Sequence, residues 1–188
     1  NAVHLHKLEF KFYNHTLVGL DYIAEDFYQI QNLPKGDIFV THQTWKCKQN
    51  EPFGTITIFD LCKNFTLTIS GDIHKHCVAN ALESAVMIPE HGKKYKFSKT
   101  FISPGPICFQ RLDASETPGA FLVWDDLSVQ SIKFKSRPVV TKRFESDAQV
   151  RQFMSHELPT ILKQASELPE SISQPIIVIR SSEFLSMI

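Results

Sequence analysis

The sequence predicts a β-rich α+β protein: an antiparallel sandwich or rolled sheet with two short helices and a C-terminal helix–strand appendage. Apolar and polar residues alternate over 54–59 and 65–70, a pattern that gives each strand one buried face and one wet face. Turn residues recur about every ten positions between 53 and 134, which favours many short strands. After residue 145 the pattern changes to that of a helix followed by an apolar strand.

Length and composition fit one globular body with a small appendage. The chain has 188 residues, of which 43% are hydrophobic and 21% charged, as in ordinary soluble domains. We expect a β-rich core domain over 1–144 and an αβ appendage over 145–188 that packs on the core or serves in assembly. The formal net charge is zero, which argues against a dominant nucleic-acid or anionic-membrane partner. No apolar run is long enough to span a bilayer, so we predict no membrane span.

The N-terminal half alternates between predicted strands and helices. Residues 5–13 and 38–45 read as strands, while Ile23, Phe27 and Ile30 share one face of a predicted helix over 21–31. Residues 54–62 and 65–70 predict a hairpin with Asn64 at its tip. A second helix is predicted over 76–87, where apolar residues gather on one side.

The C-terminal half begins with a second run of strands, whose spacing near ten residues favours antiparallel pairing. Ser146 and Gln149 predict a capping box that opens a helix, which Pro159 then kinks or divides. Residues 175–179 read as a fully buried strand. The strands predicted in this half lie at 94–102, 106–112, 119–125, 127–134 and 139–144.

Cysteines and glycosylation sequons bear on the compartment. The four cysteines have wide spacing and no CxxC pair, so they predict either two disulfides or four buried thiols rather than a zinc site. Asn14 and Asn64 begin N-glycosylation sequons and are predicted glycosylation sites. Together these features leave a secreted, lumenal or ectodomain location about as well supported as an intracellular one. The cysteines are Cys47, Cys62, Cys77 and Cys108.

Two His-x-His pairs are the candidate metal ligands. On a strand, residues two apart point to the same side, so each pair could offer two imidazoles to one ion, completed by Asp72 or Cys77. The first pair lies close to the chain terminus, and the second leads into the predicted helix, where its rings would diverge. We therefore predict solvated or locally hydrogen-bonded histidines, no metal and no cofactor. The pairs are His4-Leu5-His6 and His74-Lys75-His76.

Catalytic signatures are incomplete. His42-Gln43-Thr44 resembles one of the two His-x-Thr elements of two-histidine phosphoesterases, but a second element is missing. No cysteine has the sequence context of a nucleophile, and the chain contains no glycine-rich phosphate loop and no GxSxG elbow. Trp124-Asp125-Asp126 ends an apolar strand, where paired carboxylates hold calcium or magnesium in some proteins, but we expect these residues to form a polar turn between two strands. We predict no catalytic residue.

Basic and aromatic residues interleave in the second run of strands. This pattern suits a surface that binds an anionic polymer or a glycan, and it equally suits a wet sheet face whose lysines protect an edge from aggregation. The predicted binding residues are Lys94, Tyr95, Lys96, Trp124, Lys133, Phe134 and Lys135.

Three classes of function follow. The first is a non-enzymatic interaction or structural module that binds a protein partner or self-assembles, for example a viral or scaffold-type component. The second is a secreted or lumenal glycan-binding or receptor-type β-domain with two disulfides. The third is a histidine- or metal-dependent hydrolase, which requires His42, His74, His76 and Asp72 to converge. The missing motifs favour the first class and the absence of enzymatic activity, with a protein partner or homo-oligomer and with a glycan or anionic polymer as a further ligand.

Overall fold

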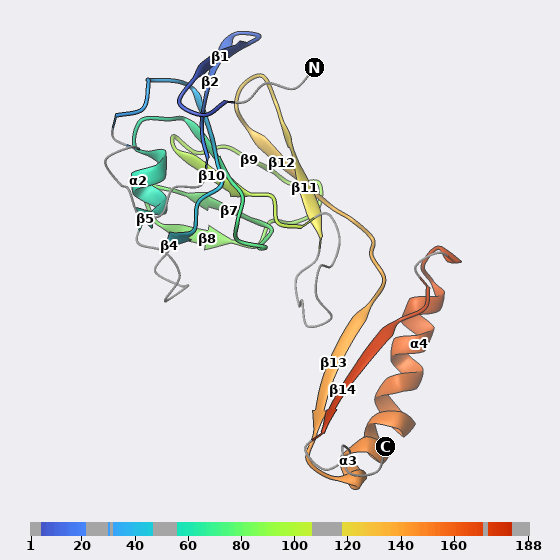
Figure 1. Cartoon of the computed structure of the whole chain (residues 1–188). Coiled ribbons are helices and arrows are strands. Elements are labelled where there is room, and N and C mark those ends of the chain that lie inside the picture. The colour runs from blue at the N-terminus through green and yellow to red at the C-terminus, as the bar shows by residue number, and fades with distance from the viewer. Residues whose placement is uncertain are drawn as a thin grey trace. The chain divides into compact units, whose positions relative to one another are not determined.

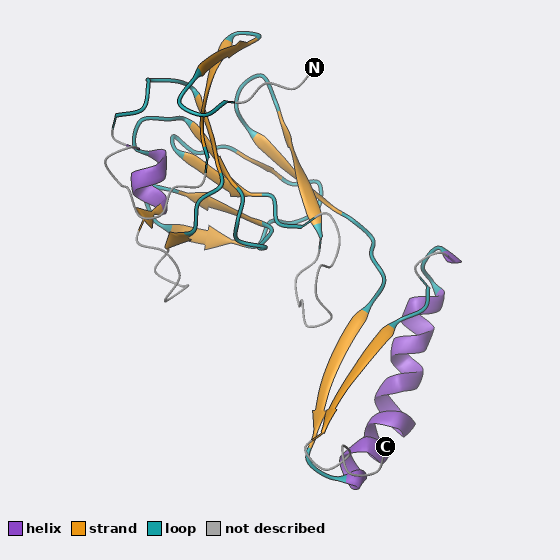
Figure 2. Ribbon diagram, in the orientation of Figure 1, coloured by secondary structure: helices purple, strands orange, loops and turns teal. Residues whose placement is uncertain are grey.

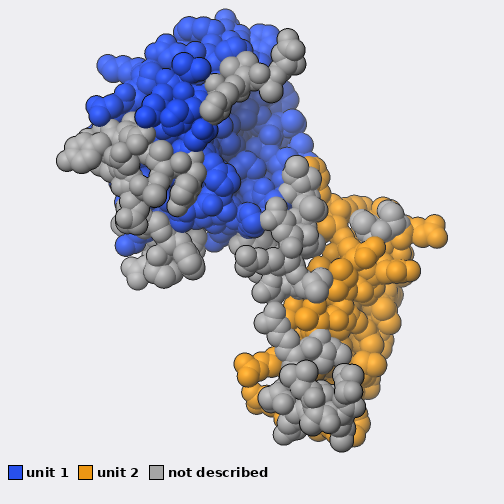
Figure 3. Space-filling view, viewed as in Figure 1, with its two compact units in different colours: residues 1–107, 119–133 blue, residues 108–118, 134–188 orange. Residues whose placement is uncertain are grey.

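The structure is a computed structural model, and it describes residues 5–21, 30, 32–46, 56–106, 118–170 and 173–181. The chain divides into two compact units, one of residues 1–107 and 119–133 and the other of residues 108–118 and 134–188 (Figure 3). We call them unit 1 and unit 2. The predicted division at residue 144 stays a prediction.

Unit 1 contains a seven-stranded mixed sheet with the order β1-β2-β3-β6-β10-β7-β8 (Figures 1 and 2). Four neighbouring strands, β2, β3, β6 and β10, run parallel, whereas β1, β7 and β8 pair antiparallel with their neighbours. The prediction of antiparallel pairing is wrong for these four, because the long connections between them allow crossovers that strand spacing does not reveal. The strands are β1 (Glu9–Phe12), β2 (His15–Leu20), β3 (Ile38–Thr41), β6 (Leu67–Ser70), β10 (Thr100–Ser103), β7 (Cys77–Asn80) and β8 (Ala85–Met87).

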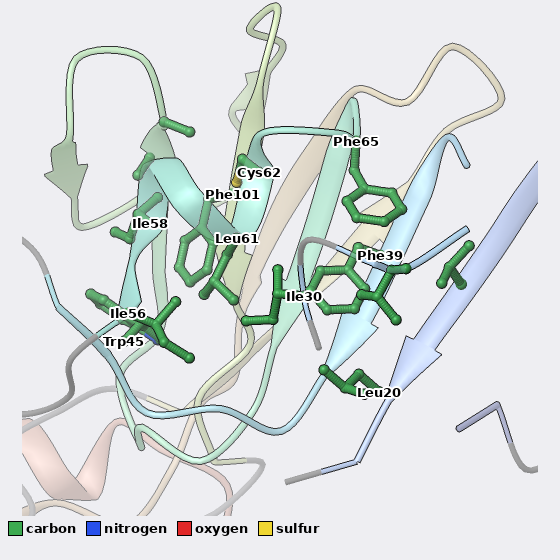
Figure 4. Close-up of a cluster of buried hydrophobic side chains, with 14 of the residues drawn as sticks. Leu20, Ile30, Phe39, Trp45, Ile56, Ile58, Leu61, Cys62, Phe65 and Phe101 are labelled. Atoms are coloured by element: carbon green, nitrogen blue, oxygen red, sulfur yellow. The ribbon is translucent and has the colours of Figure 1, made fainter. Parts of the chain in front are cut away.

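Both faces of the central strands of this sheet are buried. Along β3, Phe39 enters one hydrophobic cluster while Ile38 and Val40 face another, as the alternation of a pleated strand requires. On β10, Phe101 and Ile102 divide in the same way. The first cluster, shown in Figure 4, also holds side chains from α2 (Ile58–Cys62) and from the short β4 (Trp45–Lys46) and β5 (Ile56–Thr57).

The second cluster is closed by a three-stranded sheet with the order β11-β12-β9. Tyr95, Val129 and Phe121 of this sheet pack against Leu67, Val78 and their neighbours. The resulting sandwich-like, strand-rich α+β fold confirms the predicted fold class. The strands are β9 (Lys94–Tyr95), β11 (Gly119–Val123) and β12 (Val129–Lys133).

Two local predictions in unit 1 are wrong. Residues 58–62, predicted as strand, form helix α2, because Thr57 accepts a hydrogen bond from the Asp60 N–H and so caps its start. Residues 76–87, predicted as helix, form β7, a turn and β8, because Cys77, Val78 and Ala79 are buried against both faces of the sheet. The predicted helix over 21–31 and the predicted strand over 106–112 lie almost wholly outside the described residues.

Unit 2 contains a two-stranded parallel sheet joined by helices, so the predicted C-terminal helix followed by a strand is confirmed. Ser146 accepts from the Gln149 N–H, and Gln149 Oε1 accepts from the Glu145 N–H at 2.8 Å, so both predicted members of the capping box act at this helix start. Pro159 lies in the first turn of α4, just after a π-helical turn, where a missing N–H is tolerated. The elements are β13 (Val139–Phe144), α3 (Asp147–Gln152), the π-helical turn Phe153–Glu157, α4 (Leu158–Ser166) and β14 (Ile176–Ser181).

No helix among the described residues is long and apolar enough to cross a membrane, in agreement with the predicted absence of a span.

Candidate functional site at the ends of parallel strands

Three neighbouring parallel strands of unit 1 end side by side. Leu20 of β2 is in register with Thr41 of β3, which is in register with Ser70 of β6. Polar residues follow the three strands: Asp21 directly after β2, His42 directly after β3, and Asp72 one position later, after Gly71, at the end of β6. In sheets with parallel strands, ligands bind preferentially outside these carboxyl ends. We call the residues at these three strand ends, together with the polar residues that follow them, the carboxyl-edge site.

His42 and Asp72 form the centre of the carboxyl-edge site. His42 Nε2 lies 3.6 Å from Asp72 Oδ1, within ion-pair distance but longer than a hydrogen bond. The His42 side chain is 63% exposed and that of Asp72 is 32% exposed, so solvent reaches the imidazole while the carboxylate is partly enclosed. A histidine oriented by a carboxylate is the usual arrangement of a general base.

The backbone holds Asp72 in an uncommon conformation. Its φ is +72°, in the left-handed region that non-glycine residues rarely adopt. The Thr44 hydroxyl donates a hydrogen bond to Asp72 Oδ2 and so helps to orient the carboxylate. Such conformations cost on the order of 1–3 kcal/mol and cluster at functional sites.

Hydrogen bonds tie the three strand ends together. The Gly71 N–H donates to the Thr41 carbonyl at 2.9 Å, and the Ser70 hydroxyl donates to the Gln43 carbonyl at 3.1 Å. The buried Gln43 side chain donates to the Asp21 carbonyl at 2.9 Å. The loop that carries His42 is therefore anchored to both neighbouring strands.

Gly71 provides the space that the imidazole occupies. A Cβ at this position would lie 2.7 Å from His42 Nδ1 and 3.4 Å from Cε1. Real Cβ atoms do not approach other atoms so closely, so any larger residue at position 71 must displace the ring.

A second histidine–carboxylate pair lies at the end of β2. His6 Nδ1 is 3.5 Å from Asp21 Oδ2 and accepts a hydrogen bond from the Asp21 N–H at 3.3 Å. Gln43, the residue after His42, donates to the carbonyl of the same aspartate, so this second pair lies beside the loop that carries His42.

The Thr41 hydroxyl, directly before His42, is buried and finds no hydrogen-bond partner in the described part of the chain. An unmade hydrogen bond of a buried group costs about 1–3 kcal/mol. A bound water or ligand at the carboxyl-edge site would relieve this cost.

The predicted grouping of His42, His74, His76 and Asp72 is correct only for His42 and Asp72. His76 is buried elsewhere: its Nδ1 donates to the Pro104 carbonyl and its Nε2 accepts from the Ser131 hydroxyl, both at 2.8 Å, and its ring stacks on Phe121. His74 is exposed and does not share a face with His76. Within the described ranges no three His, Cys, Asp or Glu side chains are placed to hold a metal ion, and His4 lies outside those ranges.

The predicted binding residues occupy both units. In unit 1, Lys94 Nζ lies 4.7 Å from the centre of the exposed Trp124 ring, and Lys94 and Lys96 both form ion pairs with Asp126. Tyr95 is buried, so only its hydroxyl, which accepts from the Glu90 N–H, is polar. Lys133 also belongs to unit 1, whereas Phe134 and Lys135 belong to unit 2.

Asp125 and Asp126 form a polar turn. The Ser128 hydroxyl and N–H donate to the Asp126 carboxylate and hold its pKa well below the usual range, with smaller contributions from Lys96 and Lys94. The Asp125 carbonyl accepts from His15 Nε2 at 2.7 Å.

Cysteines and sequons are only partly described. Cys62 and Cys77 are buried thiols, so the predicted pair of disulfides does not form; Cys47 and Cys108 lie outside the described residues. Burial raises the pKa of Cys62 to about 12, which removes it as a nucleophile. Asn14 and Asn64 are exposed in turns, and their glycosylation stays a prediction.

Sequence reasoning did not find Asp21, Gln43 or Gly71 as site residues. Each lies at or near the end of a short apolar strand, and that position is informative only once the strands are known to be parallel. A search for polar residues directly after apolar strands would have found Asp21, but neither Gln43 nor Gly71.

No protein-family model matches the chain, and no curated protein matches it. Among solved structures it is similar to a metallophosphoesterase from Sphaerobacter thermophilus, with 18% sequence identity and a TM-score of 0.39. The match covers 81% of this chain and 62% of that one, so this chain spans less than two thirds of that protein's length.

The prediction of a non-enzymatic interaction or structural module is corrected, because none of these comparisons supports it. The activity of this chain has to be argued from its own carboxyl-edge site.

Proposed function

We propose that the chain is a hydrolase whose reaction takes place at the carboxyl-edge site. The observation that carries this proposal is the exposed His42 imidazole beside the partly enclosed Asp72 carboxylate. The strained conformation of Asp72 and the unpaired Thr41 hydroxyl support it, because both features are typical of functional sites.

His42 is the general base of the proposed reaction. It takes a proton from a water molecule, whose oxygen attacks the ester carbon or phosphorus, and it returns the proton to the leaving group. Asp72 orients the imidazole and stabilises its protonated form, while Thr44 fixes the carboxylate. Both groups are also of the types that bind divalent metals, and a metal ion held by His42 and Asp72 would supply a bound water as the nucleophile.

Hydrolysis of p-nitrophenyl acetate, p-nitrophenyl phosphate and bis-p-nitrophenyl phosphate tests the proposal. We expect the chain to hydrolyse at least one of them, and we expect His42→Asn and Asp72→Asn to lower kcat about 100-fold or more. Assays after chelation with EDTA, with and without added manganese or zinc, decide between the two nucleophiles. Activity that survives chelation assigns His42 as a base, and activity restored only by metal assigns His42 and Asp72 as ligands.

Matched controls are the same substitutions at exposed positions away from the site. His156→Asn on the C-terminal helices and Asp125→Asn in the turn after β11 should leave kcat unchanged. Equal activity in the wild type, His42→Asn and Asp72→Asn proteins would show that the reaction takes place elsewhere.

Contacts with an anionic ligand are a finer part of the proposal. Lys94, Lys96 and the exposed Trp124 offer two ammonium groups and an aromatic ring, so an acidic polymer or glycan would compete with Asp126 for the lysines. A protein partner or a second copy of the chain also stays a proposal.

A further inference from the structure

Strand β1 forms one edge of the seven-stranded sheet of unit 1, at the dark blue hairpin in Figure 1. It pairs with β2 on one side, and none of the described strands pairs with its other side. All four residues of β1 are exposed. An unpaired strand edge is a template for pairing with another chain.

Exposed apolar side chains lie on β1 and directly beside both of its ends. Leu8 is 55% exposed, Phe12 51% and Tyr13 84%, and Phe10 lies between them at 37%. Large apolar residues gathered on one surface are typical of interaction sites.

The two faces of β1 differ in chemistry. Successive side chains of a strand alternate, so Phe10 and Phe12 share one face of β1, whereas Glu9 and Lys11 share the opposite face. Phe10 pairs across the sheet with Leu17, which packs against the second hydrophobic cluster. The apolar face of β1 therefore continues the buried face of the sheet toward the edge.

We propose that two copies of the chain associate by antiparallel pairing of their β1 strands about a two-fold axis at Phe10. In this register Glu9 of each copy lies opposite Lys11 of the other, which places two unlike charge pairs on one face. Leu8 lies opposite Phe12 on the other face, and the two Phe10 side chains meet at the axis. Cross-strand pairs of these kinds stabilise a sheet.

Neighbouring registers are disfavoured by the same residues. An axis at Lys11 places two lysines opposite each other, and an axis at Glu9 places two glutamates opposite each other. An axis between Phe10 and Lys11 places an ammonium group against an aromatic side chain and mixes the two faces. Only the axis at Phe10 pairs unlike charges on one face and apolar groups on the other.

Charge reversal tests the register. Sedimentation equilibrium of the full chain, between about 5 and about 500 micromolar, covers the weak affinities of a small interface. We expect the wild type to dimerise and Glu9→Lys or Lys11→Glu alone to weaken dimerisation about tenfold or more, because like charges then oppose each other. An equimolar mixture of the two variants should dimerise again, since every opposed pair in the mixed dimer is unlike. The double variant Glu9→Lys/Lys11→Glu should also recover.

Glu83→Lys and Lys63→Glu, at exposed positions away from β1, are the controls for altered net charge. Neither should change dimerisation, and a thermal melt of each variant checks that it is folded. A wild type that stays monomeric over the whole concentration range overturns the proposal. The proposal is also overturned if the single variants dimerise like the wild type, or if the equimolar mixture of the two variants does not dimerise.

Discussion

At the residue scale, the carboxyl-edge site depends on a few side chains that local hydrogen bonds hold in place. His42 contributes an accessible imidazole, and Asp72 contributes a carboxylate that is held by Thr44. Gly71 has no side chain and so leaves room for the imidazole. The Gly71 N–H also donates to the Thr41 carbonyl, so this glycine joins the end of β6 to the end of β3, directly before His42.

Gly71→Ala should lower activity much more than stability. The new Cβ would lie 2.7 Å from His42 Nδ1, and the exposed ring can rotate away from it at little cost to folding. A displacement of about 1 Å at a reacting group can reduce kcat about 100-fold. Kinetics on whichever of the three p-nitrophenyl substrates the wild type hydrolyses measure the loss of activity, and a thermal melt measures the loss of stability.

The double variant Gly71→Ala/His42→Asn is the control for Gly71→Ala. If the methyl group acts through the imidazole, the double variant is no less active than His42→Asn alone. Fully additive losses would show that Gly71 acts through another residue.

At the element scale, His76 links the two sheets of unit 1. It comes just before β7, and it contacts Ser131 of β12 and Phe121 of β11. Burial lowers the pKa of this histidine, and the charge of Lys133 lowers it further, whereas the bond to the Pro104 carbonyl opposes both effects. The imidazole is therefore neutral in the folded chain at neutral pH.

Unfolding should become easier as the pH falls through the range in which His76 would be protonated in the unfolded chain. A histidine in an unfolded chain has a pKa of about 6.5, and the folded value is lower, so below that pH the unfolded state binds more protons. The contribution of His76 to the free energy of unfolding is complete above about pH 6.5. As the pH falls below this value, the contribution decreases by at most about 1.4 kcal/mol per pH unit, until the pKa of His76 in the folded chain is reached.

Urea unfolding at several pH values between about 5 and 7.5 measures this dependence. His76→Gln, which does not titrate, should show a smaller loss of unfolding free energy over the same range, whatever its stability at neutral pH. Equal slopes for the two proteins would show that His76 does not cause the dependence.

The positions of strands and helices were predictable where a local sequence pattern determines them. Alternation placed β1, β3, β6 and β13 close to their observed positions, and Ser146 marked the start of α3. The predicted helix over 76–87 failed because its apolar residues serve two buried faces of a sheet, a pattern that also fits one face of a helix. The helix α2 was missed because five residues are too few to show a helical period.

At the scale of the whole molecule, the large sheet separates two hydrophobic clusters that belong to one unit. Phe101 and Ile102 are neighbours on β10, yet they pack into opposite clusters. Because both clusters share the strands between them, loss of packing on either face should destabilise the same structure.

Phe101→Ala and Ile102→Ala should each destabilise all of unit 1. Truncations of these kinds cost about 3–5 and about 2–5 kcal/mol, a large part of the 5–15 kcal/mol of a typical domain. Hydrogen exchange should show similar loss of protection in β3 and β6 for both variants. The exposed Leu122→Ala serves as the control and should change stability by less than about 0.5 kcal/mol. A loss of protection that is confined to one face of the large sheet would show that the two hydrophobic clusters unfold separately.

The amino-acid sequence alone was sufficient to predict the fold class, because the spacing of apolar side chains within a strand or helix is a local property. The sequence also indicated His42 and Asp72 as candidate site residues, but it did not show that their side chains lie next to each other. Their convergence depends on parallel pairing of β3 with β6, and the burial of His76 depends on the second sheet that covers the first. Such contacts join residues distant in the chain, and they form only when whole elements pack to bury their apolar faces.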